Sequence, residues 1–456
     1  MAALLESNSQ NKARDISKTQ FEATELAPRR EIAAWAMFDF ANSSYTTVVT
    51  TAIFNGYFVG TICQGLSVSD ATVKLTTALG LANLLVVLTA PVVGALADAR
   101  ARKRLFLFIA TAVCVLATAS LSLMHAGQVE LCMALYVVSA FAFGSTEYLI
   151  AAFLPELAPR EKMGKISSLG WTLGYVGGLL VLGLCQVYVS HAQSLGQTPS
   201  QFVPVTLIAV AVIFALASTP TFLWLKERAL PSHANTDFAL ARRSFGKVFE
   251  TISSARRYRD LFVFLLGLFA FSCGTTTVVA LAAVYAGQVM HFSTSETIAM
   301  ILLVQIAAAG GAYGTGFIQE KLGSVRTLAL ALVVWTVAIA MSYFAQDKAI
   351  FWLASSMMGV AMGASGTAAR ALVGQLSPPG QSAEFFGLWG LTVKMAAVVG
   401  PITYGQITSL SGGNYRSALL STLAFFIIGL IITLLVNEKR GQAAVAVSGA
   451  ASAGTK

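Results

Sequence analysis

Three ionisable side chains stand inside long apolar stretches of the sequence: Asp39, Glu147 and Lys394. A charge at the centre of a bilayer costs about 3 kcal/mol, so each of them requires a partner or a function. A buried carboxyl group can take up and release a proton, because burial favours its neutral form and a nearby cation favours its charged form. Lys394 could instead hold the carboxylate of a zwitterionic solute. The structural alternative for all three is a charge pair or a helix cap.

Helical spacing gives Asp39 a polar companion, because Asn42 follows three residues later on the same side. Glu147 and Lys394 have small residues at the equivalent steps, which is typical of faces turned toward other helices. With a rise of about 1.5 Å per residue, all three ionisable side chains lie at similar depth in their stretches. We therefore expect Asp39, Asn42, Glu147 and Lys394 to form the substrate or coupling-ion site.

Membrane-spanning helices must position these residues. Of the 456 residues, 56% are hydrophobic and only 11% are charged, whereas soluble proteins carry about 25% charged residues. Twelve apolar stretches approach the length of about 20 residues that a bilayer requires: 33–59, 74–97, 104–124, 130–154, 166–189, 203–225, 261–286, 296–319, 326–345, 349–374, 384–409 and 416–436. The sequence therefore predicts an all-α membrane protein with twelve transmembrane helices in two six-helix pseudo-repeats.

The distribution of basic residues predicts the orientation, because cytoplasmic loops accumulate Lys and Arg. Most of the 30 Lys and Arg residues share one side if the N-terminus is cytoplasmic, so we expect both termini there. The predicted divisions are an N-terminal tail (1–30), a first bundle (31–225), a connector (226–260), a second bundle (261–437) and a disordered cytoplasmic tail (438–456). The connector combines basic and apolar residues as in an amphipathic helix on the inner membrane face.

A loop motif occurs once in each half of the chain. Gly94 and Asp98 are followed by Arg102 in the first half, and Gly316 and Glu320 form a weaker copy in the second. Glycine lets two helices approach closely, and the acid can bridge to a neighbouring helix end whose N-terminal dipole attracts carboxylates. We expect these residues to form a gate; the alternative is a generic charged loop.

Arg370 closes a stripe of glycines near the inner end of its predicted helix. Its long side chain can reach water from that position at little cost. We therefore expect Arg370 to act as part of the gate or as a cytoplasmic anchor.

The loop motif resembles the cytoplasmic-loop signature of the major facilitator superfamily. Residues 35–45, 154–178 and 369–401 contain blocks that resemble signatures of its vacuole-effluxer-like branch, which is related to autophagy-associated amino-acid exporters. The resemblance implies that helices 1, 4, 7 and 10 line a central cavity and that the two halves rock to give alternating access. It also implies export of a neutral amino acid or a similar small solute.

The sequence thus predicts a secondary active transporter, not an enzyme, with a proton as the candidate coupling ion. A drug-like, sugar or organic-acid cargo on the same fold is the main alternative. A membrane sensor or enzyme is a remote one, because no intramembrane His, Ser or metal constellation is visible in the sequence. No cofactor or metal is expected, since the phosphate-binding GxxxxGK[ST] motif and CxxC spacing are both missing from the sequence.

Expected partners are a small-molecule substrate and the lipid bilayer. The basic residues lie in short segments between apolar runs, so they predict topology and no nucleic-acid partner. We expect a monomer in the cell (inner) membrane, with a vacuolar membrane as the alternative.

Overall fold

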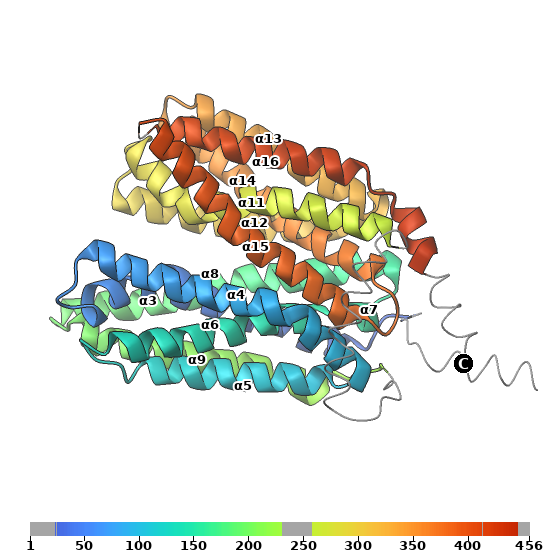
Figure 1. The fold of residues 1–456 in the computed structure, drawn as a ribbon, viewed down its shortest axis with the longest axis horizontal. Helices are drawn as coiled ribbons and strands as arrows, with labels where there is room; N and C mark the ends of the chain where they lie inside the picture. The colour runs from blue at the N-terminus through green and yellow to red at the C-terminus, as the bar shows by residue number, and fades with distance from the viewer. Residues whose placement is uncertain (1–22, 24, 230–257, 413, 446–456) are drawn as a thin grey trace, which may run out of the picture.

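A computed structural model describes residues 23, 25–229, 258–412 and 414–445. Throughout these ranges the regular elements are helices (Figure 1). The amphipathic helix expected within the connector falls outside the described residues. The predicted all-helical fold class is confirmed.

Eleven helices in the described ranges are long and apolar enough to cross a membrane. They belong to α4 (Val68–Arg100), α5 (Lys103–Leu121), α6 (Val129–Ala151), α8 (Met163–Ser194), α9 (Pro199–Trp224), α11 (Arg259–Gln288), α12 (Thr294–Leu322), α13 (Ser324–Phe344), α14 (Lys348–Leu376), α15 (Ser382–Leu410) and α16 (Tyr415–Leu434). Large apolar side chains such as Leu88 and Leu116 are more than half exposed. Lipid is the solvent that such surfaces require, so the chain is a multi-pass membrane protein.

The first predicted span, 33–59, is an irregular helix. It begins as α2 (Arg29–Tyr45), continues through a π-helical stretch (Thr46–Ala52) into α3 (Phe54–Tyr57), and ends in a second π-helical stretch (Phe58–Ile62). A π turn holds more residues than an α turn and often occurs at functional sites. Because this segment is not among the eleven regular spans, the total of twelve stays a prediction.

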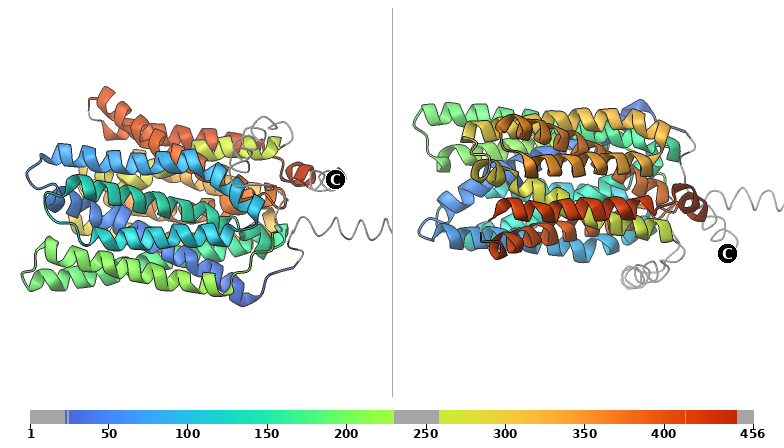
Figure 2. Two further views of the ribbon diagram at one scale, coloured as in Figure 1. Left: turned by 60° about the horizontal axis from the view of Figure 1, so that its bottom comes forward. Right: turned by 90° about the horizontal axis from the view of Figure 1, so that it is seen from above.

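The helices form two bundles that lie one above the other in Figure 1, α2 to α9 below and α11 to α16 above. In the first bundle α2 packs on α8 and α9, and in the second α12 packs on α14. The bundles meet where α4 packs on α15 and where α8 packs on α12. Figure 2 shows from two further directions that the long helices run side by side along the molecule.

Glycines bring the two bundles together along α4 and α15. A Cβ on Gly387 would lie 2.6 Å from the carbonyl oxygen of Ala90, and a Cβ on Gly94 would collide with the carbonyl of Ala383. Small residues commonly let backbones touch in this way in membrane proteins. Gly94 of the first loop motif therefore lies at the point where the bundles touch.

One end of the molecule gathers the basic loops, and we call it the basic end. It carries the α4–α5 turn, the short helix α7 (Leu154–Leu157) with the loop that follows it, and the start of α11; it lies at the right in Figure 1. A short helix at 438–445 also packs there. The prediction of a disordered tail was wrong for these residues, because the side chains of Glu438 and Arg440 bind the second bundle.

Candidate functional site

Asp39 and Arg370 form an ion pair between the bundles. Asp39 lies on α2 and Arg370 on α14, and Asp39 Oδ2 is 2.6 Å from Arg370 Nη1. Arg370 also donates to Ser167 of α8, from Nε to Oγ at 3.1 Å and from Nη2 to the carbonyl oxygen at 2.7 Å. Only 12% of the Asp39 side chain and 5% of the Arg370 side chain are exposed. One buried guanidinium therefore binds two helices of the opposite bundle.

Aromatic rings and a glycine enclose this pair. The Arg370 guanidinium lies 4.7 Å from the ring centre of Trp35 and 5.4 Å from that of Trp171, close enough for cation–π attraction to both rings. The indole N–H of Trp35 donates to the carbonyl oxygen of Ile150 at 2.8 Å, which fixes the ring. Gly170 leaves space for the pair, because a Cβ there would lie 2.6 Å from Arg370 Nη2. The pair is thus packed on several sides by protein.

Glu147 and Lys394 form a second ion pair between the bundles. Lys394 Nζ of α15 lies 2.7 Å from Glu147 Oε2 of α6. Unlike the first pair, this one is accessible: 36% of the Glu147 side chain and 18% of the Lys394 side chain are exposed. Each charged side chain thus has the other as its partner across the bundle interface, as an ionisable group inside a membrane protein requires.

Asn42 is bound within the first bundle. The hydroxyl of Thr146 donates to Asn42 Oδ1 at 3.0 Å, and both residues are buried. Thr146 precedes Glu147 on α6, while Asn42 lies one turn from Asp39 on α2. This hydrogen bond therefore fixes the helix that carries one ion-pair carboxylate against the helix that carries the other.

The two pairs can do different chemistry. Asp39 is enclosed and paired with a cation. Uptake of a proton would neutralise the Asp39 carboxylate and leave the Arg370 guanidinium without its ionic partner. Glu147 and Lys394 share one hydrogen bond, although an ammonium has three donors and a carboxylate about four acceptor positions. This single bond therefore does not use all of the hydrogen-bonding positions of either side chain.

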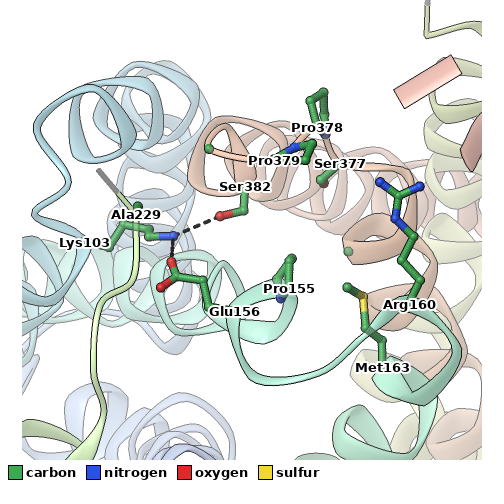
Figure 3. Close-up of a pocket in the computed structure, with 12 residues that line it drawn as sticks. Lys103, Pro155, Glu156, Arg160, Met163, Ala229, Ser377, Pro378, Pro379 and Ser382 are labelled. Atoms are coloured by element: carbon green, nitrogen blue, oxygen red, sulfur yellow. Dashed lines mark hydrogen bonds and ion pairs between the residues drawn. The ribbon is translucent and has the colours of Figure 1, made fainter. Parts of the chain in front are cut away.

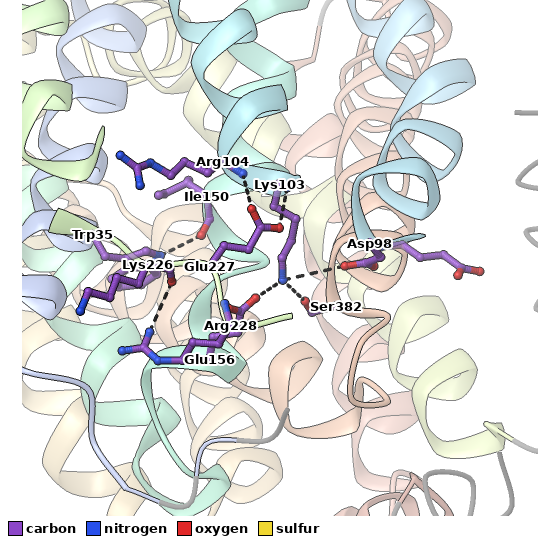
Figure 4. A network of polar contacts seen from close by, with 11 residues as sticks. Trp35, Asp98, Lys103, Arg104, Ile150, Glu156, Lys226, Glu227, Arg228 and Ser382 are labelled. Atoms are coloured by element: carbon purple, nitrogen blue, oxygen red, sulfur yellow. Dashed lines mark hydrogen bonds and ion pairs between the residues drawn. The ribbon is translucent and has the colours of Figure 1, made fainter. Parts of the chain in front are cut away.

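Asp98 of the first loop motif binds the start of α15. The backbone N–H of Glu384 donates to Asp98 Oδ2 at 2.9 Å, and Lys103 Nζ lies 3.8 Å from Asp98 Oδ1. Figure 4 shows Asp98 and Ser382 converging on the Lys103 ammonium. A carboxylate that lies against the first turn of a long helix is stabilised by the unpaired N–H groups of that turn and by the helix dipole. Asp98 thus joins the two bundles at the basic end.

Lys103 is the buried cation of this network. Its ammonium pairs with Glu156 and donates to Ser382 Oγ at 3.0 Å, at the edge of a small pocket (Figure 3). Arg102, which the motif suggested for the gate, is exposed. Ala101 adopts a φ of 49° at the end of α4, and this left-handed turn directs the side chain after Arg102 inward. The structure therefore places Lys103 between the bundles.

The described start of the connector belongs to the same network (Figure 4). Glu227 accepts the first two backbone N–H groups of α5 at 2.7 and 3.2 Å. Burial raises the pKa of Glu227 above its ordinary value, although those N–H groups oppose the shift. The backbone N–H of Arg228 donates to Glu156 Oε2 at 2.5 Å. The connector thus begins by capping α5 and binding the carboxylate that pairs with Lys103.

The second loop motif is looser than the first. Glu320 lies 3.8 Å from Lys165 Nζ, and 33% and 53% of these side chains are exposed. Gly316 packs against Ser168, because a Cβ at Gly316 would lie 2.5 Å from the Ser168 hydroxyl. Both copies therefore lie at the bundle interface, and the weaker sequence match coincides with the more exposed ion pair.

The structure regroups the residues selected from sequence. Arg370, expected at the gate near water, lies instead beside Asp39 in the interior. Ser167 and Lys103 were not identified from sequence; the signal available for Ser167 was its place one turn before the glycine spacing of α8. No group of three His, Cys, Asp or Glu residues suited to a metal ion occurs among the described residues.

Sequence comparisons connect the chain to known membrane proteins. The model of the family described as "Vacuole effluxer Atg22 like" matches residues 59–446. "Uncharacterized MFS-type transporter YxiO" of Bacillus subtilis is 24% identical over 409 residues, which cover 89% of this chain and 94% of that protein. "Autophagy-related protein 22-1" of Penicillium rubens is 24% identical over 302 residues, 61% of this chain and 50% of that protein. The chain thus spans about half the length of the fungal relatives that it matches.

Solved structures show the same fold at low sequence identity. The proton:xylose symporter XylE matches with a TM-score of 0.68 and 15% identity, over 89% of this chain and 94% of that one. FucP in the outward conformation matches with a TM-score of 0.70 and 14% identity, over 90% and 98% of the two chains. The predicted major facilitator fold is confirmed.

Proposed function

This chain belongs to the Atg22-like vacuole effluxer family of major facilitator transporters, and from that premise we propose that it moves a zwitterionic amino acid or a similar small solute, coupled to protons. The observation that carries the proposal is the unequal exposure of two ion pairs between the bundles, Asp39–Arg370 and Glu147–Lys394. The buried pair serves the proton, and the accessible pair serves the solute.

The Glu147–Lys394 pair suits a solute that carries both charges. A bound ammonium group can replace Lys394 at the Glu147 carboxylate, and a bound carboxylate can replace Glu147 at the Lys394 ammonium. Each side chain keeps a partner, so neither charge is left unpaired in the membrane interior. A neutral amino acid is the smallest common solute with this pattern.

The Asp39–Arg370 pair suits coupling. Protonation of Asp39 removes the attraction that binds α14 to α2, while Arg370 keeps its hydrogen bonds to Ser167. Loss of a buried ion pair between two rigid bundles favours their separation at that level. Proton binding at Asp39 is thereby linked to rocking of the bundles and to alternating access.

Transport into proteoliposomes tests the proposal. We would measure uptake of radiolabelled amino acids with and without an imposed pH gradient, and counterflow for exchange. We expect export to be the direction of transport in the cell. Asp39→Asn should lose gradient-driven accumulation and retain exchange. Glu147→Gln and Lys394→Ala should raise KM for the amino acid at least tenfold, the effect of about one charge-assisted hydrogen bond.

Lys74 and Glu130 provide a matched control. They form an ion pair at 2.6 Å within the first bundle, so it does not join the two bundles. Lys74→Gln should therefore leave KM and gradient dependence unchanged. Accumulation of a sugar, a drug-like solute or an organic acid in place of every amino acid would contradict the proposed cargo, and gradient dependence that survives Asp39→Asn would contradict the coupling.

We place the transporter in the cell membrane with its basic end in the cytoplasm. The bacterial relative covers a larger share of the chain than the fungal ones, which supports this membrane over a vacuolar one. The basic loops at one end support the orientation.

A further inference from the structure

The C-terminal helix, residues 438–445, is anchored to the second bundle through its first turn. Arg440 donates to both carboxylate oxygens of Asp260 at 2.8 Å, and Asp260 Oδ1 also accepts the backbone N–H of Asn437 at 2.8 Å. Glu438 accepts the backbone N–H groups of Ser324 and Val325, at 3.0 and 3.2 Å. The helix is therefore held at the starts of α11 and α13.

The same helix also contacts the first bundle. Arg160, in the loop before α8, donates from Nη1 to the carbonyl oxygen of Gln442 at 3.0 Å. Beside this contact, Gln375 at the end of α14 donates to the backbone carbonyl of Arg160 at 2.7 Å. The Arg160 loop is thus bound both by α14 and by the C-terminal helix. These bonds cross the bundle interface at the basic end.

Gly441 lets the C-terminal helix lie close to the second bundle. A Cβ on Gly441 would lie 2.5 Å from Leu376 Cδ2 and 3.1 Å from the Cβ of Asp260. Beside this contact, Tyr258, Leu261 and Val445 help to line a cavity of about 190 Å³ between the helix and the bundle. A short terminal helix that is held by a few hydrogen bonds is among the easier parts of a fold to detach.

We infer that the C-terminal helix is a latch that holds the basic end closed, by joining the Arg160 loop of the first bundle to the second bundle. Separation of the bundles at this end must break the Arg160–Gln442 bond, whereas the contacts with Asp260, Ser324 and Val325 move with the second bundle. The latch therefore stabilises the closed state selectively, and a change that lifts the helix favours the state open at the basic end. This inference does not depend on the cargo or on the coupling ion.

Distance measurements between two spin labels test the latch without any substrate. Glu161 and Lys321 are exposed at the basic end on opposite bundles, and the five native cysteines are buried. Glu161→Cys and Lys321→Cys therefore give two accessible labelling sites. Pulsed electron–electron double resonance in nanodiscs would report the fraction of molecules with a long distance between the two labels.

Two variants disturb the latch in different ways. Arg160→Gln removes the bond to Gln442, and Gly441→Val places a branched side chain against Leu376 and Asp260, which crowds the helix where it packs on the second bundle. Each should raise the ratio of long-distance to short-distance molecules about three- to tenfold, because a typical net hydrogen bond changes an equilibrium between two states by about that factor. Lys162→Gln, a neighbouring exposed cation, is the matched control and should leave the distribution unchanged.

Three outcomes would overturn the latch. Unchanged distances in both variants would show that the helix does not favour the closed state. A change in Arg160→Gln without one in Gly441→Val would show that Arg160 acts through contacts other than the C-terminal helix. An equal change in Lys162→Gln would show that loop charge, and not the bond to Gln442, controls the opening.

Discussion

Glu227 and Glu438 cap equivalent helices in the two bundles. Glu227 follows α9 and accepts the first backbone N–H groups of α5 at 2.7 and 3.2 Å, while Glu438 follows α16 and accepts those of α13 at 3.0 and 3.2 Å. Each carboxylate thus ties the chain that leaves its bundle to the third long helix of that bundle. The internal repeat therefore extends beyond the loop motif that reveals it in the sequence.

The Glu227 cap should give stability a specific pH dependence. Burial raises the pKa of Glu227 above its usual 4.5, so the folded protein favours the neutral carboxyl. The resulting stability is present below pH 4.5 and is lost as the pH rises through the raised pKa. We expect the Tm of the wild type to fall relative to that of Glu227→Gln over this range. Thermal unfolding in detergent between about pH 4 and 7.5 measures both Tm values. A difference in Tm that stays constant across this range would contradict the prediction.

Gly170→Ala should disrupt the Asp39–Arg370 pair. The added methyl group would lie 2.6 Å from Arg370 Nη2 and 2.9 Å from the ring of Trp35, inside a closely packed enclosure. We expect a loss of about 1–3 kcal/mol in stability and a large loss of transport. Gly183→Ala, on the same helix with open space around it, is the control and should retain both. Equal transport rates for the two variants would refute the prediction.

Arg370→Met should destabilise the protein more than Asp39→Asn combined with Arg370→Met. The single change leaves the Asp39 carboxylate buried without its cation, at a cost of about 3–5 kcal/mol. The double change removes both charges, so part of that loss should be recovered. A double-mutant cycle on thermal unfolding measures the coupling, and additive effects would show that the two charges do not interact.

Asp98→Asn should open the basic end more than Glu320→Gln does. Asp98 binds both the start of α15 and the buried Lys103, whereas Glu320 forms an exposed ion pair at 3.8 Å. An exposed pair contributes about 0–1 kcal/mol, so Glu320→Gln should be nearly silent. The two variants can be compared by placing a cysteine at the basic end and measuring how fast a membrane-impermeant reagent labels it. A similar increase in both variants would contradict the difference in burial.

Sequence predicted the helices well because apolar length is a local property. Eleven of the predicted spans coincide with long apolar helices, because the length of an apolar run can be counted along one segment. Arg370 was assigned to the gate by the same counting, but α14 continues to Leu376, so the residue lies nearly two turns inside the helix. Its partner Asp39 is 331 positions away in sequence, and no local pattern indicates such a contact.

The gate cation could not be selected from sequence for a different reason. Arg102 and Lys103 are adjacent basic residues with equal claims to the motif. The left-handed φ of 49° at Ala101 decides which of them points inward, and alanine gives no hint of that conformation because L residues rarely adopt it.

The π-helical stretch at Thr46–Ala52 also determines where the first helix tolerates deletion. A π turn contains one residue beyond the α-helical repeat, so removal of one residue within 46–52 would restore ordinary helical register locally. Loss of one residue between Trp35 and Asp39 would instead rotate one relative to the other by about 100°, and the indole would leave the guanidinium that it covers. The first helix thus has a tolerant segment near its middle and an intolerant one around the ion pair.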